Sequence, residues 1–353
     1  MPENIRSKLD AQGATKAQAI KAKAIIAQGM KQGNFQVSPE AQRRVAANMA
    51  IARVYHEFGG SPGNFVGDLV AEGPGFYRQY ERGRIYFNPD LGAFYVYGAI
   101  GDKYIQLGGT SSWLGWPISH EEDFSEGGRV TKFQNGAIYF WGDTGPIELK
   151  AIRVRYTGLA CFGVTNDGAG GLLGAGTGDE PYLIMAPVPL STLTENTYRT
   201  KVPSQDAVHA GDALRDNINL YEGDPYGMVL GVVLMESDYG DPDKFKKQVE
   251  EAVGDAVDGI STGAGALFGS GAGTVVDKVG KALAPEIAKA VNKLLDTDDD
   301  VIGTCALNIT PKQMVTLAKA PPAMFRGISF KLDTPLISGD GGSYKAHFSI
   351  DAI

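Results

Sequence analysis

The stretch TKFQNGAIYFWGDTGPI (Thr131–Ile147) repeats an earlier one, RQYERGRIYFNPDLGAF (Arg78–Phe94), at an offset of 53 residues. The matched pairs are Tyr80 with Phe133, Gly83 with Gly136, Ile85 with Ile138, Tyr86 with Tyr139, Phe87 with Phe140, and Gly92 with Gly145. In each copy a glycine turn separates short runs rich in Tyr, Phe and Ile, a pattern typical of a β-hairpin. One hairpin cannot bury its apolar face alone, so we predict that residues 51–150 fold as one module of two stacked copies.

The second copy resembles the LGFP repeat. It has the segment IGDKYIQLGG (Ile100–Gly109), then LGWP (Leu114–Pro117), then the hairpin FQNGAIYFW. The first copy keeps GGSPG at 59–63 and the hairpin, and we expect FVGD (65–68) at the LGWP position. In bacterial envelope proteins the repeat occurs beside cell-wall hydrolases and mycolyltransferases. The resemblance therefore implies a protein held on cell-wall polysaccharide, with a binding pocket lost from the first copy.

All three tryptophans of the chain lie within this second copy. Aromatic faces flanked by fixed polar groups are what a sugar ring packs against, although most aromatics of such a repeat belong to the core. We expect Trp113 and Trp141 to be the most exposed. The predicted glycan-binding residues are Trp113, Trp116, Tyr139 and Trp141.

Length, composition and charge limit the function classes. The 353 residues, 43% hydrophobic, are enough for two or three folding units with real cores. The net charge is −8, and residues 151–353 hold 26 acidic against 17 basic side chains, which argues against nucleic acid as a partner. The N-terminus has no recognisable signal peptide, and no ordinary membrane-spanning segment is present. With the resemblance, we expect an extracellular or cell-envelope protein.

The N-terminal residues 1–50 read as a helical arm. Residues 3–32 combine helical composition with a weak apolar stripe. A second helix begins at Ser38, a good N-cap, with Pro39 in the first position, and ends at the glycines 59 and 60. The sequence allows either a packing helix pair or a self-association arm.

Residues 151–353 alternate like the strands of a β-sandwich and resemble the C2 domain, which binds calcium and phospholipid. The first predicted strand contains Cys161 and a later one contains Cys305, both expected to be free buried thiols. The motif DDxIG stands at Asp299, Asp300, Ile302 and Gly303. The fold class is therefore mainly β with helical additions: N-terminal helices, an LGFP-type hairpin module, and a C2-like antiparallel sandwich interrupted by an α-helical hairpin.

The C2 resemblance implies a calcium site in acidic loops at one end of the sandwich. Calcium takes about six to eight oxygen ligands, which converging loops can supply. The matching residues are Asp167, Asp179, Glu236, Asp238, Asp243, Asp298 and Asp300. The alternative is a solvated acidic loop tip, because an aspartate before residue 244 is also a good N-cap.

Residues 244–297 form an insert that the C2 family lacks. DKFKKQVEEAVGDAVDGI and APEIAKAVNKLL are amphipathic, and a glycine-rich turn that contains Leu267 and Phe268 joins them. The insert is either a helical hairpin laid against the sandwich or a membrane-active hairpin, in which case Leu267 and Phe268 contact lipid.

Catalysis is not expected, because no nucleophile, metal-protease or phosphate-loop signature occurs. Two functions remain. The first is a surface-recognition protein that binds a polysaccharide or glycoconjugate through its repeats, with calcium as the possible cofactor of the sandwich. The second is a pore-forming or membrane-perturbing toxin, for example an insecticidal one, in which the repeats bind a receptor glycan and the insert enters the lipid membrane.

Overall fold

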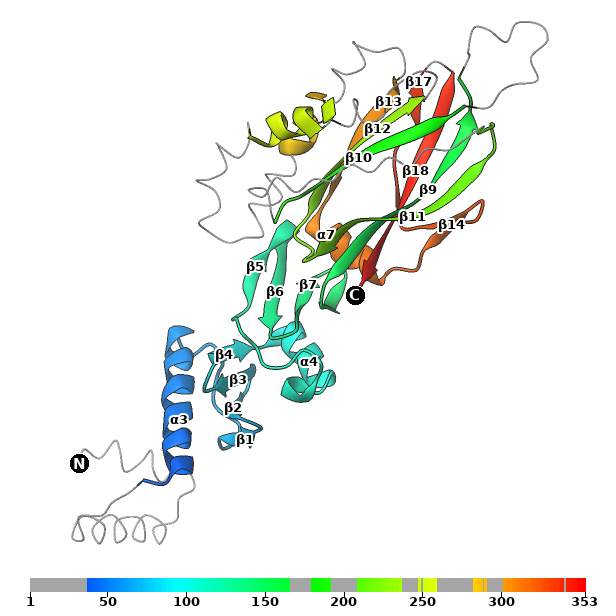
Figure 1. Cartoon of the computed structure of the whole chain (residues 1–353). Helices are drawn as coiled ribbons and strands as arrows, with labels where there is room; N and C mark the ends of the chain where they lie inside the picture. Colours follow the sequence, from blue (N-terminus) through cyan, green and yellow to red (C-terminus); the bar gives the residue numbers. More distant parts are fainter. Residues whose placement is uncertain are drawn as a thin grey trace, which may run out of the picture.

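The computed structural model describes residues 37–165, 179–191, 208–236, 247–248, 250–258, 282–287, 289–290, 301–339 and 341–353. Along the chain, one long helix is followed by two small antiparallel sheets and then by a β-sandwich (Figure 1). The predicted fold class, mainly β with helical additions, is confirmed. The first arm helix, expected over residues 3–32, lies outside the described residues.

Helix α3 (Pro39–Glu57) begins and ends where the sequence predicts. The Ser38 hydroxyl accepts a hydrogen bond from the Ala41 N–H at 3.2 Å, which satisfies one of the free donors of the first turn. After Glu57, Gly59 and Gly60 take positive φ angles of 59° and 76° and turn the chain away. Its buried residues Ala47, Ile51 and Val54 pack on the first sheet, so α3 crosses the predicted boundary at residue 50 and belongs to the core of the first repeat.

The two repeats form two four-stranded sheets with the same strand order. The first contains β1 (Val70–Glu72), β2 (Gly75–Tyr80), β3 (Gly83–Asn88) and β4 (Gly92–Val96). The second contains β5 (Glu122–Phe124), β6 (Gly128–Phe133), β7 (Gly136–Trp141) and β8 (Gly145–Leu149). Between them lie helix α4 (Gly98–Gln106) and the short helix η1 (Gly109–Ser111), while η2 (Ser125–Gly127) follows β5. The prediction of two related hairpins is therefore confirmed.

The turn before each sheet is equivalent in detail, and it corrects the sequence alignment of the first copy. In the second repeat the Trp116 N–H donates to Gln134 Oε1 at 2.9 Å. In the first repeat the Asn64 N–H donates to Glu81 Oε2 at 3.2 Å in the same way. LGWP (Leu114–Pro117) therefore corresponds to PGNF (Pro62–Phe65), and the expected match with FVGD is wrong.

Both turns keep a glycine at the same position, although the residues around it differ between LGWP and PGNF. Gly115 and Gly63 adopt φ angles of 71° and 81°, which favour glycine. A Cβ on Gly115 would lie 2.7 Å from Gln134 Oε1, and one on Gly63 would lie 2.4 Å from Glu81 Oε2. The backbone of the turn is thus conserved between the copies, while the aromatic Trp116 is replaced by the exposed Asn64.

The C-terminal part is a sandwich of two antiparallel sheets. One has the order β10-β12-β13, and the other has the order β11-β9-β18-β16 with β17 also paired to β18. The bounds are β9 (Ile152–Gly163), β10 (Pro181–Pro189), β11 (Ala213–Gly223), β12 (Met228–Glu236), β13 (Val301–Ile309), β16 (Leu332–Asp333), β17 (Ile337–Gly339) and β18 (Gly342–Ala352). Strands β14 (Ala323–Phe325) and β15 (Ile328–Phe330) pair separately as a hairpin.

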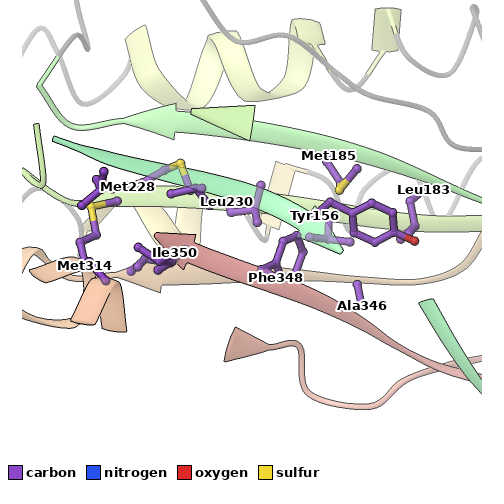
Figure 2. Packing of buried hydrophobic residues seen from close by; sticks show 14 of the residues in the cluster. Tyr156, Leu183, Met185, Met228, Leu230, Met314, Ala346, Phe348 and Ile350 are labelled. Atoms are coloured by element: carbon purple, nitrogen blue, oxygen red, sulfur yellow. The ribbon is translucent and has the colours of Figure 1, made fainter. Parts of the chain in front are cut away.

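The inward faces of both sheets build one core. Figure 2 shows Leu183, Met185 and Leu230 of one sheet facing Tyr156 and Phe348 of the other. Helix α7 (Pro311–Lys319) closes one end of this core, where Met314 lies near Met228 and Ile350. Burial of these apolar side chains is the main stabilising contribution to the sandwich. The C2-like character of the sandwich stays a prediction.

The other face of the β10-β12-β13 sheet is also covered. Residues 250–258 and 282–287 are helical and bury Val253, Val257, Leu283 and Ile287 against Tyr182, Ile184 and Val233. This explains why β12 is buried at every position instead of alternating. The glycine-rich turn between the two helical segments lies outside the described residues.

Both cysteines are free, as predicted; Cys161 is buried, whereas Cys305 is half-buried. Cys161 lies on β9 and Cys305 on β13, in different sheets of the sandwich. Burial raises the pKa of the Cys305 thiol to about 12, so it is protonated and unreactive at neutral pH.

Candidate functional site

Three of the four aromatic residues predicted to bind glycan are buried. Trp116, Tyr139 and Trp141 are 6%, 4% and 2% exposed, whereas Trp113 is 45% exposed. The expectation of an exposed Trp141 is therefore wrong, and the same expectation for Trp113 is confirmed. A sugar ring needs an accessible aromatic face, and Trp113 offers the largest one among these four residues.

Trp116 packs between the two repeats. Its ring occupies the space beside Gly75 of the first sheet, where a Cβ would lie 2.6 Å from Trp116 Cη2. The ring also meets Tyr86 edge-to-face, with 6.4 Å between the ring centroids. Asn64, its counterpart in the first repeat, is exposed. The tryptophan of LGWP is thus a repeat-stacking residue in this chain.

Tyr139 and Trp141 pack on the sandwich side of the second sheet. They alternate along β7 and join the sandwich core together with Phe124 and Leu149. The Trp141 indole N–H donates to the Ser125 carbonyl at 2.9 Å, which satisfies it without solvent. Burial raises the pKa of Tyr139 well above its usual value. The sandwich therefore covers the face that a following repeat would otherwise cover.

Trp113 is held as a one-sided platform. It follows η1, and its carbonyl accepts a hydrogen bond from Asn135 Nδ2 at 2.9 Å. The ring rests against Gly136, where an added Cβ would lie 2.9 Å from Trp113 Cζ3. Glycine at 136 thus lets the ring lie on the backbone of β7, while the rest of the ring stays exposed.

A pocket of about 250 Å³ opens beside Trp113, at the junction of the second repeat and the sandwich. Its lining residues are Trp113, Glu148, Leu149, Lys150, Lys319, Ala352 and Ile353. On the repeat side they are Trp113, which follows η1, and three residues at the end of β8 and just after it. On the sandwich side they are Lys319 of α7 and two residues at the end of β18 and just after it, so the folding of both parts is needed to form the pocket.

Ion pairs fix the polar wall of this pocket. Glu148 lies 2.9 Å from Lys103 Nζ and 3.2 Å from Lys319 Nζ. Burial acts to raise the pKa of Glu148, but the hydrogen bonds from the two lysines outweigh it, and the pKa is lowered. Glu148 is therefore a fixed anion at neutral pH, unsuited to donate a proton.

Helix α7 strengthens the junction at two further points. The Thr310 hydroxyl donates to Glu126 Oε2 at 2.7 Å, and Lys312 Nζ lies 2.8 Å from Asp143 Oδ2. With the Lys319 pair, these contacts hold the sandwich helix against the loops of the second repeat. The geometry of the pocket is thus set by several contacts at once.

A second pocket, of about 200 Å³, adjoins the first. Its lining residues are Ile118, Lys132, Phe133, Gly136, Ala137, Tyr139, Lys150, Asp224 and Tyr226. Lys150 lines both pockets, and Gly136 lies under Trp113 as well as in the second pocket. We call the two pockets together the junction groove.

Lys150, Lys319 and Tyr226 were not among the predicted site residues. Lys319 and Tyr226 are far from Trp113 in the sequence and reach the groove only because the sandwich docks on the repeat. A signal did exist for Lys150, because it directly follows the aromatic strands that the repeat pattern defines.

Of the predicted calcium ligands, Asp179 and Glu236 lie in the described residues and are brought together. Thr165 Oγ1 lies 2.9 Å from Asp179 Oδ1 and 2.7 Å from Glu236 Oε2. Asp179 also accepts from the Thr165 N–H and from the Tyr344 hydroxyl. Within the described residues, no group of three or more His, Cys, Asp or Glu side chains is arranged to hold a metal ion. Calcium stays a prediction, since Asp167, Asp238, Asp243, Asp298 and Asp300 lie outside the described residues.

The predicted membrane-contacting residues, Leu267 and Phe268, also lie outside the described residues. The neighbouring helical segments point their apolar residues Val253 and Leu283 at the sandwich sheet. In the part of the chain that the structure describes, no helix is both long and apolar enough to cross a bilayer.

Comparison with known families identifies the repeats. The LGFP repeat model matches residues 66–112 and 114–160. The first match ends after α4, so the family unit runs from the turn through the sheet to the following helix. In the second match that helix position is occupied by β9 of the sandwich. None of the curated proteins compared with the chain matches it. LGFP repeats are cell-surface-associated repeats, which indicates a surface or cell-wall-related protein.

Proposed function

We propose that this chain is a non-enzymatic recognition protein of the cell surface or cell wall, and that its junction groove binds a glycan. The observation that carries the proposal is the one-sided exposure of Trp113 beside polar groups that ion pairs hold in place. The C–H bonds of a sugar ring pack on such an aromatic face, while its hydroxyls find fixed donors and acceptors in the wall of the pocket.

The size of the groove supports an extended, partly exposed ligand. Each pocket is smaller than the roughly 300–1,000 Å³ of a site that encloses a small molecule. Two small adjoining pockets, with Trp113 in one and Tyr226 in the other, suit successive units of a saccharide chain. A polysaccharide is bound through internal units of a long chain, and an open groove can accommodate a chain that continues beyond the site on both sides.

Within the described residues, the first repeat lacks a counterpart of the Trp113 platform. Ser61 follows the helix and glycine pair of the first repeat, as Trp113 does in the second. Tyr95 and Tyr97 take the positions of Glu148 and Lys150 in the first repeat, and their rings stack with centroids 4.5 Å apart. We therefore expect one glycan per chain.

Binding of the full chain to a broad glycan panel tests the proposal. Trp113→Ala should abolish binding, and Trp113→Phe should retain part of it, because a smaller aromatic face remains. Trp113→Ala must keep its melting temperature, since the ring lies outside the cores. Glycan binding that is unchanged in a folded Trp113→Ala variant would remove the groove as the site.

A further inference from the structure

The junction groove is lined by three lysines, Lys132, Lys150 and Lys319, and by two carboxylates, Glu148 and Asp224. Lys150 and Lys319 lie with Glu148 in the Trp113 pocket, and Lys132 and Asp224 lie in the second pocket. The whole chain has a net charge of −8, so this local excess runs against the charge of the protein. Charge of this sign at a ligand pocket favours an anionic ligand.

The ion pairs of these lysines show which one is available to a ligand. Lys103 and Lys319 both pair with Glu148 and so together leave about one unit of positive charge uncompensated. Among the described residues, no carboxylate lies within ion-pair distance of Lys150. Lys150 is exposed, and it lines both pockets of the groove. Lys150 thus lies where the two pockets meet.

From this arrangement we infer that the junction groove selects an acidic saccharide, in which a carboxylate or sulfate group pairs with Lys150 while the adjoining ring packs on Trp113. The inference rests on the proposed glycan-binding function and adds its ligand class. The Lys319 side chain, held by Glu148, supplies a second cation to the same anionic group or to that of the next unit.

Comparing each acidic oligosaccharide with its own neutral form tests the inferred ligand class directly. The full chain is applied to an array in which each acidic oligosaccharide stands beside its neutral form: a uronate beside its methyl ester, and a sulfated chain beside its desulfated form. We expect at least one acidic member to bind about tenfold more tightly than its neutral partner, and this difference to shrink as salt rises from 0.05 to 0.5 M.

Variants separate the contribution of charge from that of the platform. Lys150→Gln should remove most of the preference for the acidic form, measured as the ratio of the affinities for the acidic and neutral members of a pair. Lys247→Gln is the matched control, because it removes the same charge from an exposed helical position outside both pockets. It should leave the preference intact.

The outcomes distinguish the two proposals. Trp113-dependent binding that is equally strong for acidic and neutral partners overturns the inferred ligand class and leaves glycan binding in place. The absence of Trp113-dependent binding across the whole array overturns both. An acidic preference that survives Lys150→Gln, or that Lys247→Gln lowers to the same extent, overturns the role of Lys150 and assigns the preference to charge elsewhere on the protein.

Discussion

Replacing Trp116 by alanine should separate the first repeat from the rest of the molecule. The ring fills the space between Gly75 and Tyr86 and is 6% exposed, so its removal leaves a cavity between two sheets. A buried tryptophan covers about 150–250 Å². At about 25 cal/mol per Å², this corresponds to about 4–6 kcal/mol as an upper estimate. Large-to-small substitutions of this kind cost about 3–5 kcal/mol, and we expect a loss within that range.

The loss of stability in Trp116→Ala should affect the first repeat before the rest of the molecule. In a repeat array each unit is stabilised by its own packing and by its contact with the neighbouring unit. Hydrogen exchange should therefore accelerate first in β2, β3 and β4, while β9 and β18 keep their protection. Urea unfolding followed by far-UV circular dichroism should change from one transition towards two.

Trp113→Ala is the matched control for Trp116→Ala, since it removes the same side chain three residues earlier. Because Trp113 lies outside the cores, its removal should cost less than about 1 kcal/mol. Equal losses for the two variants, or unchanged exchange in the first sheet of Trp116→Ala, would refute the role of Trp116 in repeat stacking.

Four further predictions follow from the same geometry. Gly136→Ala should displace the Trp113 ring and lower glycan affinity at least tenfold in calorimetric titrations, because its Cβ would lie 2.9 Å from the ring; the same Cβ would lie 2.5 Å from the Leu149 carbonyl oxygen, so the melting temperature is measured alongside, and unchanged affinity would argue against the platform. The free energy of unfolding should fall as pH drops below about 6.5, because burial lowers the pKa of His120 and His347, so that the unfolded chain binds protons that the folded chain excludes. Urea titrations at pH 7 and 5.5 measure this fall, and His347→Phe should make the fall smaller. Asp179→Asn should cost about 1–3 kcal/mol, since Thr165 and Tyr344 lose a charged acceptor, and an intact melting curve would contradict this. Calcium should raise the melting temperature if the acidic loops bind it, and Asp238→Asn combined with Asp298→Asn should remove the rise; a curve that is the same in calcium and in chelator would leave only a solvated loop tip.

The repeat could be predicted from sequence because its pattern is local. Glycine turns between aromatic runs fix the hairpins, and Ser38 with Pro39 fixes the start of α3. Strand boundaries such as those of β9 and β18 follow from alternation over many residues. In each case the residues that determine the element lie within it or next to it.

The exposure of the aromatic residues could not be predicted in the same way. Trp141 lies on a strand whose two faces are both covered, one by the first repeat and one by the sandwich. Period-two alternation does not reveal which parts of the chain will cover a face. Trp113 was correctly expected to be exposed, but Lys319 reaches it only when α7 docks on the repeat. Local patterns therefore point to Trp113 and Lys150, but not to the side chains that the sandwich contributes.

The direct passage from repeat to sandwich has a mechanical consequence. Only Lys150 and Ala151 separate β8 from β9, and β9 is paired along its length with both β11 and β18. Hydrogen bonds between antiparallel strands lie across the strand direction, so a pull along β9 loads many of them in parallel. A protein tethered through the groove would pass tension straight into the sheet instead of stretching a flexible linker.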